Sequence, residues 1–210
     1  MSTTIQVERL AESGFAAAAG ALARAFLDDD PMFNIFEPDR ARRAVTLPVF
    51  MAWGCRYCHR FGESYTTADP IRGAAWWIPP DSDDITPDRL DATGFGQVVE
   101  AWGEGAIGRF GTVNAHLEAL HHRNLPQAHW YLIGMGVDPP YQGQGIGGAL
   151  MQPVLRKADA AGLPCYLETQ KSRNVPFYRR DGFEVVAETD APDGGPHFWH
   201  MVRPPLTVQG

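Results

Sequence analysis

The chain has 210 residues, of which 44% are hydrophobic and 20% are charged, and its formal net charge is −7. This composition is typical of a globular protein with a sizeable core, and the length suits one large domain or two small ones. The acidic balance argues against a nucleic acid partner, because surfaces that bind phosphate backbones are usually basic. An acidic surface can attract small cationic substrates, although solubility alone would also explain the charge.

The N-terminal segment shows no basic region followed by an apolar run, as a signal peptide would. No apolar stretch approaches the roughly 20 residues that a helix needs to cross a bilayer. We therefore expect a cytoplasmic protein that has no membrane partner.

Three cysteines, Cys55, Cys58 and Cys165, do not make the disulfide framework of a small secreted protein. Residues 55–59 match a haem-attachment string, and their Cys-x-x-Cys spacing also occurs in redox pairs and zinc sites. The string nevertheless lies inside an amphipathic helical pattern, and no second Cys or His pair with suitable spacing appears. We expect core cysteines and no metal.

The first half of the chain mixes helical and strand patterns. In chain order we expect a strand over residues 4–10, helices over 14–27 and 40–61, and strands over 63–68 and 71–78. The acidic run Asp28–Asp30 and Pro31 end the first helix, and Pro48 bends the second. Residues 81–91 predict a loop, and residues 91–124 are loosely helical without clear boundaries.

Residues 129–137 predict a central strand, because apolar side chains occupy both of its faces. Gly134 and Gly136 within it indicate a bulge, or a place where a backbone or a ligand comes close. The later elements are a helix over 149–161 interrupted by Pro153, a strand over 164–169, a short helix from Asn174, and strands over 183–187 and 198–202. No linker or repeat divides the chain, so we expect one mixed α/β domain over residues 1–210.

A glycine-rich run joins the central strand to the next helix, and it comprises Gln142, Gly143, Gln144, Gly145, Ile146, Gly147 and Gly148. A strand, a glycine turn and a helix start together present several backbone N–H groups and a partial positive charge to one phosphate. The pattern therefore predicts a nucleotide-bearing cofactor. The alternative is a tight turn that only serves close packing of the helix on the strand.

Several motifs in order resemble the GNAT superfamily of N-acetyltransferases: Gln142-x-x-Gly145-x-Gly147, Asn174, and Phe177-Tyr178-x-x-x-Gly182-Phe183. Segments 136–139, 166–169 and 173–178 further resemble puromycin N-acetyltransferase and its actinobacterial relatives. The resemblance is strongest over residues 128–204, where the donor-binding motifs lie, and loose over residues 1–80.

The resemblance implies acetyl-coenzyme A as the acetyl donor and a primary amine as the acceptor, with direct transfer in a ternary complex. It also implies a mixed, mostly antiparallel sheet of about seven strands, flanked by helices, whose splayed central strands hold the donor. The residues expected to bind the donor are Met135, Gly136, Val137, Gln142, Gly143, Gln144, Gly145, Ile146, Gly147, Gly148, Asn174 and Tyr178. The protein is expected to be a monomer or a homodimer.

Tyr178 and Glu168 are the candidate catalytic residues. A phenol is protonated at neutral pH, so Tyr178 could give its proton to the leaving thiolate, the role that the resemblance implies. Glu168 is the single charge in an apolar strand and could accept the proton of an arriving ammonium group. The alternatives are a packing aromatic for Tyr178 and an ion pair, for example with Arg173, for Glu168.

The acceptor is the least determined part of the sequence interpretation. The candidate acceptor-binding residues, which would suit an apolar or aromatic amine such as an aminonucleoside-like antibiotic, are Phe26, Asp29, Phe33, Trp53, Tyr57, Trp76, Trp77, Glu168, His197 and Trp199. His121 and His122 are expected on a solvated helix end. An acetyltransferase for protein N-termini or lysines would have an open groove instead, and a noncatalytic acyl-coenzyme A-binding module would need neither Tyr178 nor Glu168.

Overall fold

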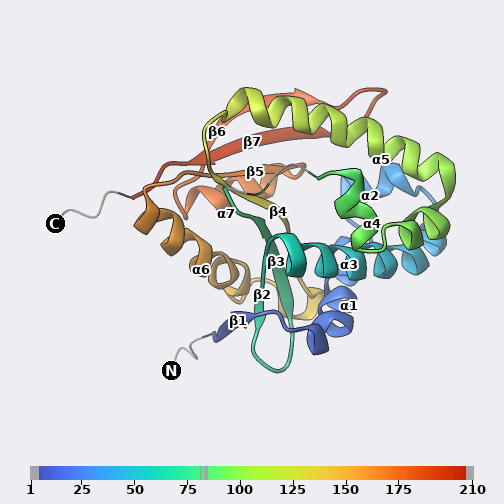
Figure 1. Ribbon diagram of the computed structural model, residues 1–210, viewed down its shortest axis with the longest axis horizontal. Coiled ribbons are helices and arrows are strands. Elements are labelled where there is room, and N and C mark those ends of the chain that lie inside the picture. The colour runs from blue at the N-terminus through green and yellow to red at the C-terminus, as the bar shows by residue number, and fades with distance from the viewer. Residues whose placement is uncertain (1–4, 81, 83–84, 207–210) are drawn as a thin grey trace.

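The computed structural model describes residues 5–80, 82 and 85–206, and in them seven strands form one sheet in the order β1-β2-β3-β4-β5-β7-β6 (Figure 1). The strands are β1 (Val7–Arg9), β2 (Glu63–Thr67), β3 (Gly73–Ile78), β4 (Trp130–Val137), β5 (Cys165–Thr169), β6 (Glu184–Asp190) and β7 (His197–Arg203). Neighbours pair antiparallel except β4 and β5, which are parallel. The mixed, mostly antiparallel sheet expected from the sequence is confirmed.

Helices cover both faces of this sheet (Figure 1). They are α1 (Phe15–Phe26), α2 (Pro31–Phe36), α3 (Arg40–Phe61), α4 (Pro87–Ala92), α5 (Gly96–Asn124), α6 (Ile146–Ala161) and α7 (Val175–Arg179), with short 3-10 turns η1 (Glu12–Gly14), η2 (Pro139–Tyr141) and η3 (Ser172–Asn174). Helix α6 packs on one face of β1–β4, and α1 and α3 pack on the opposite face. Helix α5 continues the layer of α1 and α3.

Two short helices were not predicted. The acidic run ends α1 as expected, but its last residue also begins α2, because the Asp30 carboxylate accepts hydrogen bonds from the backbone N–H groups of Met32 and Phe33 at 3.1 Å. Helix α4 lies where a loop was expected over residues 81–91, with Thr86 as its N-cap and Pro87 at its first position. The loosely helical segment is α5, interrupted at Gly103, whose φ of 75° is left-handed.

The three cysteines are buried and free, as expected for core residues. Burial raises the pKa of both Cys55 and Cys165 to about 12, so their thiolate forms are suppressed at neutral pH. The residues that the structure describes contain no group of three or more His, Cys, Asp or Glu side chains arranged to hold a metal ion. Within the same residues, no helix is both long and apolar enough to cross a membrane.

A β-bulge at Ile133 changes which way β4 presents its side chains. Trp76 of β3 is opposite Gly134, whereas Trp77 is opposite Leu132, so Ile133 is an extra residue in β4. Leu132 therefore faces the α6 side of the sheet, and Gly134, two positions later, faces the ring of Trp76 on the other side.

Gly136 follows the same reversed alternation and lies against α1. A Cβ placed on it would lie 2.9 Å from side-chain atoms of Leu22 and Phe26, and 3.1 Å from the Cβ of Ala25. The two glycines of β4 thus make room for the protein's own side chains on this face, which is one of the alternatives that the sequence left open.

We predict that Gly136→Ala destabilises the protein, because Ala25 is fixed on its helix and the added methyl group overpacks the contact. The free energy of unfolding should fall by about 1–3 kcal/mol in urea titrations. Gly108→Ala is the control: Gly108 is exposed on α5 with nothing within 4 Å of the new methyl group, so this change should raise stability by up to about 1 kcal/mol. Equal stability of Gly136→Ala and the wild type would contradict the packing argument.

Candidate active site

The parallel strands β4 and β5 pair over only three residues and then separate. Their register is Trp130 with Cys165, Tyr131 with Tyr166 and Leu132 with Leu167. Beyond this point β4 continues to Val137 and pairs only with β3, and β5 continues to Thr169 and pairs only with β7. The bulge at Ile133 coincides with the separation. The edges of the two strands that face each other are therefore open to another hydrogen-bonding group.

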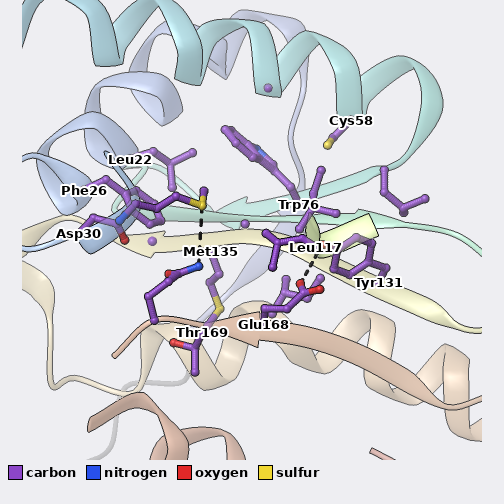
Figure 2. A pocket seen from close by; sticks show the side chains of 18 of the residues that line it. Leu22, Phe26, Asp30, Cys58, Trp76, Leu117, Tyr131, Met135, Glu168 and Thr169 are labelled. Atoms are coloured by element: carbon purple, nitrogen blue, oxygen red, sulfur yellow. Dashed lines mark hydrogen bonds between the residues drawn. The ribbon is translucent and has the colours of Figure 1, made fainter. Parts of the chain in front are cut away.

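A cavity of about 1540 Å³ is lined by both separated strands. On the α6 side of the sheet it reaches the glycine turn and α7, and on the other side it reaches α1, α2, α3 and α5. Figure 2 shows Glu168 and Thr169 of β5 on the side of the pocket opposite Trp76 and Cys58. Met135 of β4 lies between them.

The glycine turn leads into the N-terminus of α6. Gly143 and Gly145 have left-handed φ angles of 75° and 82°, which glycine adopts without strain. A Cβ on Gly143 or Gly148 would meet nothing within 4 Å, whereas a Cβ on Gly147 would lie 3.1 Å from the ring of Phe177. Gly147 thus serves packing, and the open space beside Gly143 and Gly148 fits an anion at the helix N-terminus.

Two glutamine side chains bond back to the chain and brace this turn. Gln142 Nε2 donates to the carbonyl of Val137 at 2.9 Å, and Gln144 Nε2 donates to the carbonyl of Pro140 at 3.3 Å. Each bond uses one N–H of a side-chain amide and holds the turn in place beside the N-terminus of α6.

Tyr178 of α7 lines the cavity and packs against Phe177 and Phe183. Among the described residues its hydroxyl has no hydrogen-bond partner, and burial raises the pKa of the phenol well above its usual value. Asn174 stands just before α7, as predicted, but it does not cap the helix. Its side chain donates to Thr169 Oγ1 at 3.0 Å and ties α7 to the end of β5.

Glu168 faces the cavity from β5, and its side chain is only 5% exposed. Its Oε2 accepts a hydrogen bond from the Tyr131 hydroxyl at 2.8 Å, as Figure 2 shows, while its Oε1 has no hydrogen-bond partner within the described residues. Burial raises the pKa of this carboxyl to about 7, against the smaller lowering effect of the hydrogen bonds. The ion pair with Arg173 considered from the sequence does not form, because Arg173 pairs with Asp29.

Six further candidates for the acceptor site line the cavity: Phe26, Asp29, Phe33, Trp53, Tyr57 and Trp76. Trp77, His197 and Trp199 do not. Trp77 is fully buried in the core on the α6 side, because adjacent residues of a strand face opposite ways, and its neighbour Trp76 lines the cavity instead. His197 is at the exposed start of β7 and bonds Asp190 and Glu188.

His121 was expected in solvent and is instead packed at the cavity. Its ring stacks on Tyr166 with centroids 4.5 Å apart, and its Nε2 lies 2.5 Å from Nε2 of His129. Burial is the main cause that lowers its pKa to about 3. Tyr131, which bonds Glu168, was also missed as a site residue. The alternation of residues 129–137 was visible, but nothing in the sequence said which face would meet a cavity.

A polar bridge crosses the cavity mouth next to Asp29. The Arg173 guanidinium pairs with Asp29, and Lys171 Nζ lies 3.9 Å from the buried carboxylate of Asp30. The residues after β5 are thereby held against the start of α2.

The sequence profile of the acetyltransferase (GNAT) family matches residues 59–183. The chain belongs to this GNAT family of acetyl-transferring enzymes. An uncharacterized N-acetyltransferase of Schizosaccharomyces pombe is 41% identical over 54 residues, which are 26% of this chain. The match spans 22% of the length of that curated relative.

Solved structures share this GNAT fold. A Corynebacterium glutamicum protein described as histone acetyltransferase HPA2 and related acetyltransferase superposes with a TM-score of 0.71 at 20% identity, over 99% of this chain and 100% of that one. A polyamine N-acetyltransferase of Drosophila melanogaster has a TM-score of 0.65 at 15% identity, over 96% and 100%. Naa20 of Chaetomium thermophilum, solved with a bisubstrate analogue, has a TM-score of 0.52 at 16% identity, over 96% of this chain and 87% of that one.

We predict that the Glu168 carboxyl makes the free energy of unfolding fall as the pH rises from about 4.5 to about 7, and that this contribution levels off above the folded-state pKa. Its pKa is higher in the folded state than the reference value of 4.5, so the folded protein binds the extra proton in this range and loses that advantage as the group ionises. The full effect is about 3 kcal/mol, from 1.36 kcal/mol for each unit between the two values.

Glu168→Gln should remove this dependence, so the variant gains stability relative to the wild type at pH 8.5 but not at pH 4. Urea unfolding across this range measures it, with exposed Glu100→Gln as the control. A constant difference between Glu168→Gln and the wild type at every pH would show that the carboxyl does not titrate as stated.

Proposed function

We propose that this GNAT protein transfers the acetyl group of acetyl-coenzyme A to a primary amine of a small molecule, with Glu168 and Tyr178 moving the protons. The observation that carries the proposal is that one cavity is lined by the glycine turn, Glu168 and Tyr178 together. GNAT acetyltransferases use acetyl-coenzyme A, which supplies an activated acetyl thioester when bound.

The donor end of the cavity fits this coenzyme. Backbone N–H groups over residues 143–148 would hold the diphosphate, because the space beside Gly143 and Gly148 is open and the positive end of the α6 dipole lies there. The open edge of β4 at Met135–Val137 would pair with the amides of the pantetheine arm, as an added strand does. Asn174 and Tyr178 would flank that arm from the α7 side.

The two candidate catalytic residues suit opposite proton transfers. Glu168 has a pKa of about 7 and an oxygen without a hydrogen bond, so it could take a proton from an ammonium group near neutral pH. The Tyr178 phenol stays protonated and has no hydrogen-bond partner among residues 5–80, 82 and 85–206, so it could donate to a departing thiolate. The simultaneous presence of both favours an enzyme over a noncatalytic module that only binds an acyl-coenzyme A.

The acceptor end favours a small amine that carries an apolar or aromatic body. Its wall is largely aromatic and aliphatic, and it includes Phe26, Phe33, Phe50, Trp76, Phe110 and Leu117. Residues of α2 and α5 line this part of the cavity, whereas an enzyme for protein N-termini or lysines would need an open groove. Glu168 supplies the negative charge that would attract an ammonium group, because Asp29 is already paired with Arg173.

The proposal extends to the identity of the acceptor, the biological role, the location and the oligomeric state. The resemblance of segments 136–139, 166–169 and 173–178 to puromycin N-acetyltransferases makes an aminonucleoside antibiotic a candidate acceptor and resistance a candidate role. A cytoplasmic location and a monomeric or homodimeric state are proposed on the same basis.

We predict amine-dependent release of coenzyme A thiol when the purified protein meets acetyl-coenzyme A and an apolar amine. A suitable panel is 2-phenylethylamine, tryptamine, puromycin, spermidine and a short peptide with a free N-terminus. Tyr178→Phe should lower kcat about 100-fold or more, with little change in the Kd for acetyl-coenzyme A, because only the proton is lost.

Tyr65→Phe is the matched control, since the Tyr65 hydroxyl bonds Glu63 outside the cavity and this variant should keep the wild-type kcat. Thiol release that is strongest with the peptide would favour the protein-acetyltransferase alternative. Full activity of Tyr178→Phe would remove the phenol from the mechanism.

We predict that Gly148→Asp weakens the binding of acetyl-coenzyme A at least about tenfold by repelling its diphosphate. The fold should not suffer, because space is open at this position and an acidic residue in the first turn of a helix is favourable. Isothermal titration calorimetry measures the Kd. Gly108→Asp places the same charge on α5 and should leave the Kd unchanged, and an unchanged Kd for Gly148→Asp would argue against the diphosphate site.

A further inference from the structure

His200 is a fully buried histidine of β7 that none of the roles above uses. It is opposite Glu168 in the register of β5 and β7, and its Nδ1 lies 3.9 Å from the free Oε1 of Glu168. That separation is too long for a direct hydrogen bond. Two hydroxyl groups complete its surroundings: Tyr166 OH lies 2.7 Å from Nδ1 and Thr189 Oγ1 lies 2.8 Å from Nε2.

This bonding pattern accommodates either tautomer of the His200 ring. A hydroxyl group can both donate and accept a hydrogen bond, whereas a carbonyl or a carboxylate in its place would fix the proton on one nitrogen. With a hydroxyl at each nitrogen, His200 can exchange its N–H between Nδ1 and Nε2 without losing a bond. Tyr166 and Glu168 are two positions apart on β5 and so lie on the same face of the sheet, where Tyr166 contributes to lowering the pKa of the Glu168 carboxyl.

The chain of groups leads out of the protein. Glu168 and His200 are buried, but Thr189 of β6 is only half-buried and lies beside the exposed end of the β6–β7 ladder. The sequence Glu168, Tyr166, His200, Thr189 thus runs from the cavity across β5, β7 and β6, on one face of the sheet, toward the β6 edge.

We propose that Tyr166, His200 and Thr189 form a relay that carries the amine proton from Glu168 to solvent. Glu168 takes the proton from the acceptor ammonium and passes a proton to the Tyr166 oxygen, while the Tyr166 proton moves to His200 Nδ1. The Nε2 proton of His200 moves to Thr189, and the Thr189 proton leaves to water. One proton enters and one leaves at each group, so no charge accumulates in the core.

The groups around His200 favour its neutral ring. Besides Glu168, Tyr166 and Thr189, it faces His116 and Arg123 of α5 and His197 of its own strand. Burial and these basic neighbours lower its pKa to about 4, so the ring is uncharged at neutral pH. A neutral ring carries one N–H and one bare nitrogen, as a relay requires.

The relay rests on the proposed role of Glu168, and it is tested with Thr189→Val and Thr189→Ser. Valine has the shape of threonine but lacks the hydroxyl, whereas serine keeps it. In protein labelled with ¹⁵N-histidine, His200 of the wild type and of Thr189→Ser should show both ring nitrogens at shifts between those of protonated and bare nitrogen. Thr189→Val should show one fixed tautomer. His200→Gln assigns the signals.

The kinetic arm uses thiol release with the most active amine of the panel above. Thr189→Val should lower kcat about tenfold or more, with an unchanged KM for acetyl-coenzyme A, and added imidazole buffer should restore it. A fixed tautomer in the wild type, or a wild-type kcat in Thr189→Val, would overturn the relay. The proposed function and the relay fail on different measurements. Absence of amine-dependent thiol release by the wild type would overturn the proposed function, whereas the tautomer of His200 is measured without any substrate.

Discussion

The loss of pairing between β4 and β5 after Leu132 and Leu167 is the constraint on which the rest of the structure depends. Two neighbouring strands in a folded sheet ordinarily satisfy each other's backbone groups, and a buried group without a partner is costly. Here the extra residue Ile133 lets β4 follow β3 while it leaves β5. The space that results passes through the sheet and connects its two faces.

The elements around this space follow from it. The glycine turn comes directly after the separated end of β4, so the α6 N-terminus points toward one mouth. Helix α7 comes after the separated end of β5 and is tied back to it by Asn174 and Thr169. Glu168 lies on the separated part of β5, where one carboxylate oxygen is held by Tyr131 and the other is buried near His200 with no hydrogen bond from the described residues.

Burial of Glu168 is tolerable because its two oxygens have different surroundings. The hydrogen bond from Tyr131 stabilises the ionised form, and desolvation opposes it, so the carboxyl titrates near neutral pH. Full pairing with a cation would have held it ionised, and a fully apolar site would have held it protonated. The arrangement leaves both forms accessible, which a group that accepts and releases protons requires.

Local patterns explain which parts could be predicted. The long helices, the order of the strands and the glycine turn follow from periodicity and from glycine and proline, which act over a few residues. The bulge could not be predicted, because Ile133 is an ordinary strand residue and only the register with β3 makes it extra. Because of that single extra residue, Gly134 and Gly136 lie on the α1 and α3 side of the sheet.

The acceptor residues were harder to predict than the donor residues for a related reason. To choose between Trp76 and Trp77, one must know which face of the sheet each side chain of β3 lies on, and this depends on the helices that pack against each face. The position of His121 depends on how α5 crosses the sheet, and α5 has weak helical signals, with glycines inside it. Contacts between residues far apart in the sequence decide where these side chains lie, and local sequence patterns carry no information about such contacts.

The cavity draws its two ends from different stretches of chain. Residues 135–147 and 174–180 line one part of the cavity, whereas α2, α5 and residues 50–58 of α3 line the other. Glu168 and its neighbours on β4 and β5 lie where the two strands separate. Substitutions in residues 31–36 and 96–124 during evolution can therefore change which molecules enter this part of the cavity, without changing the residues that line the other part.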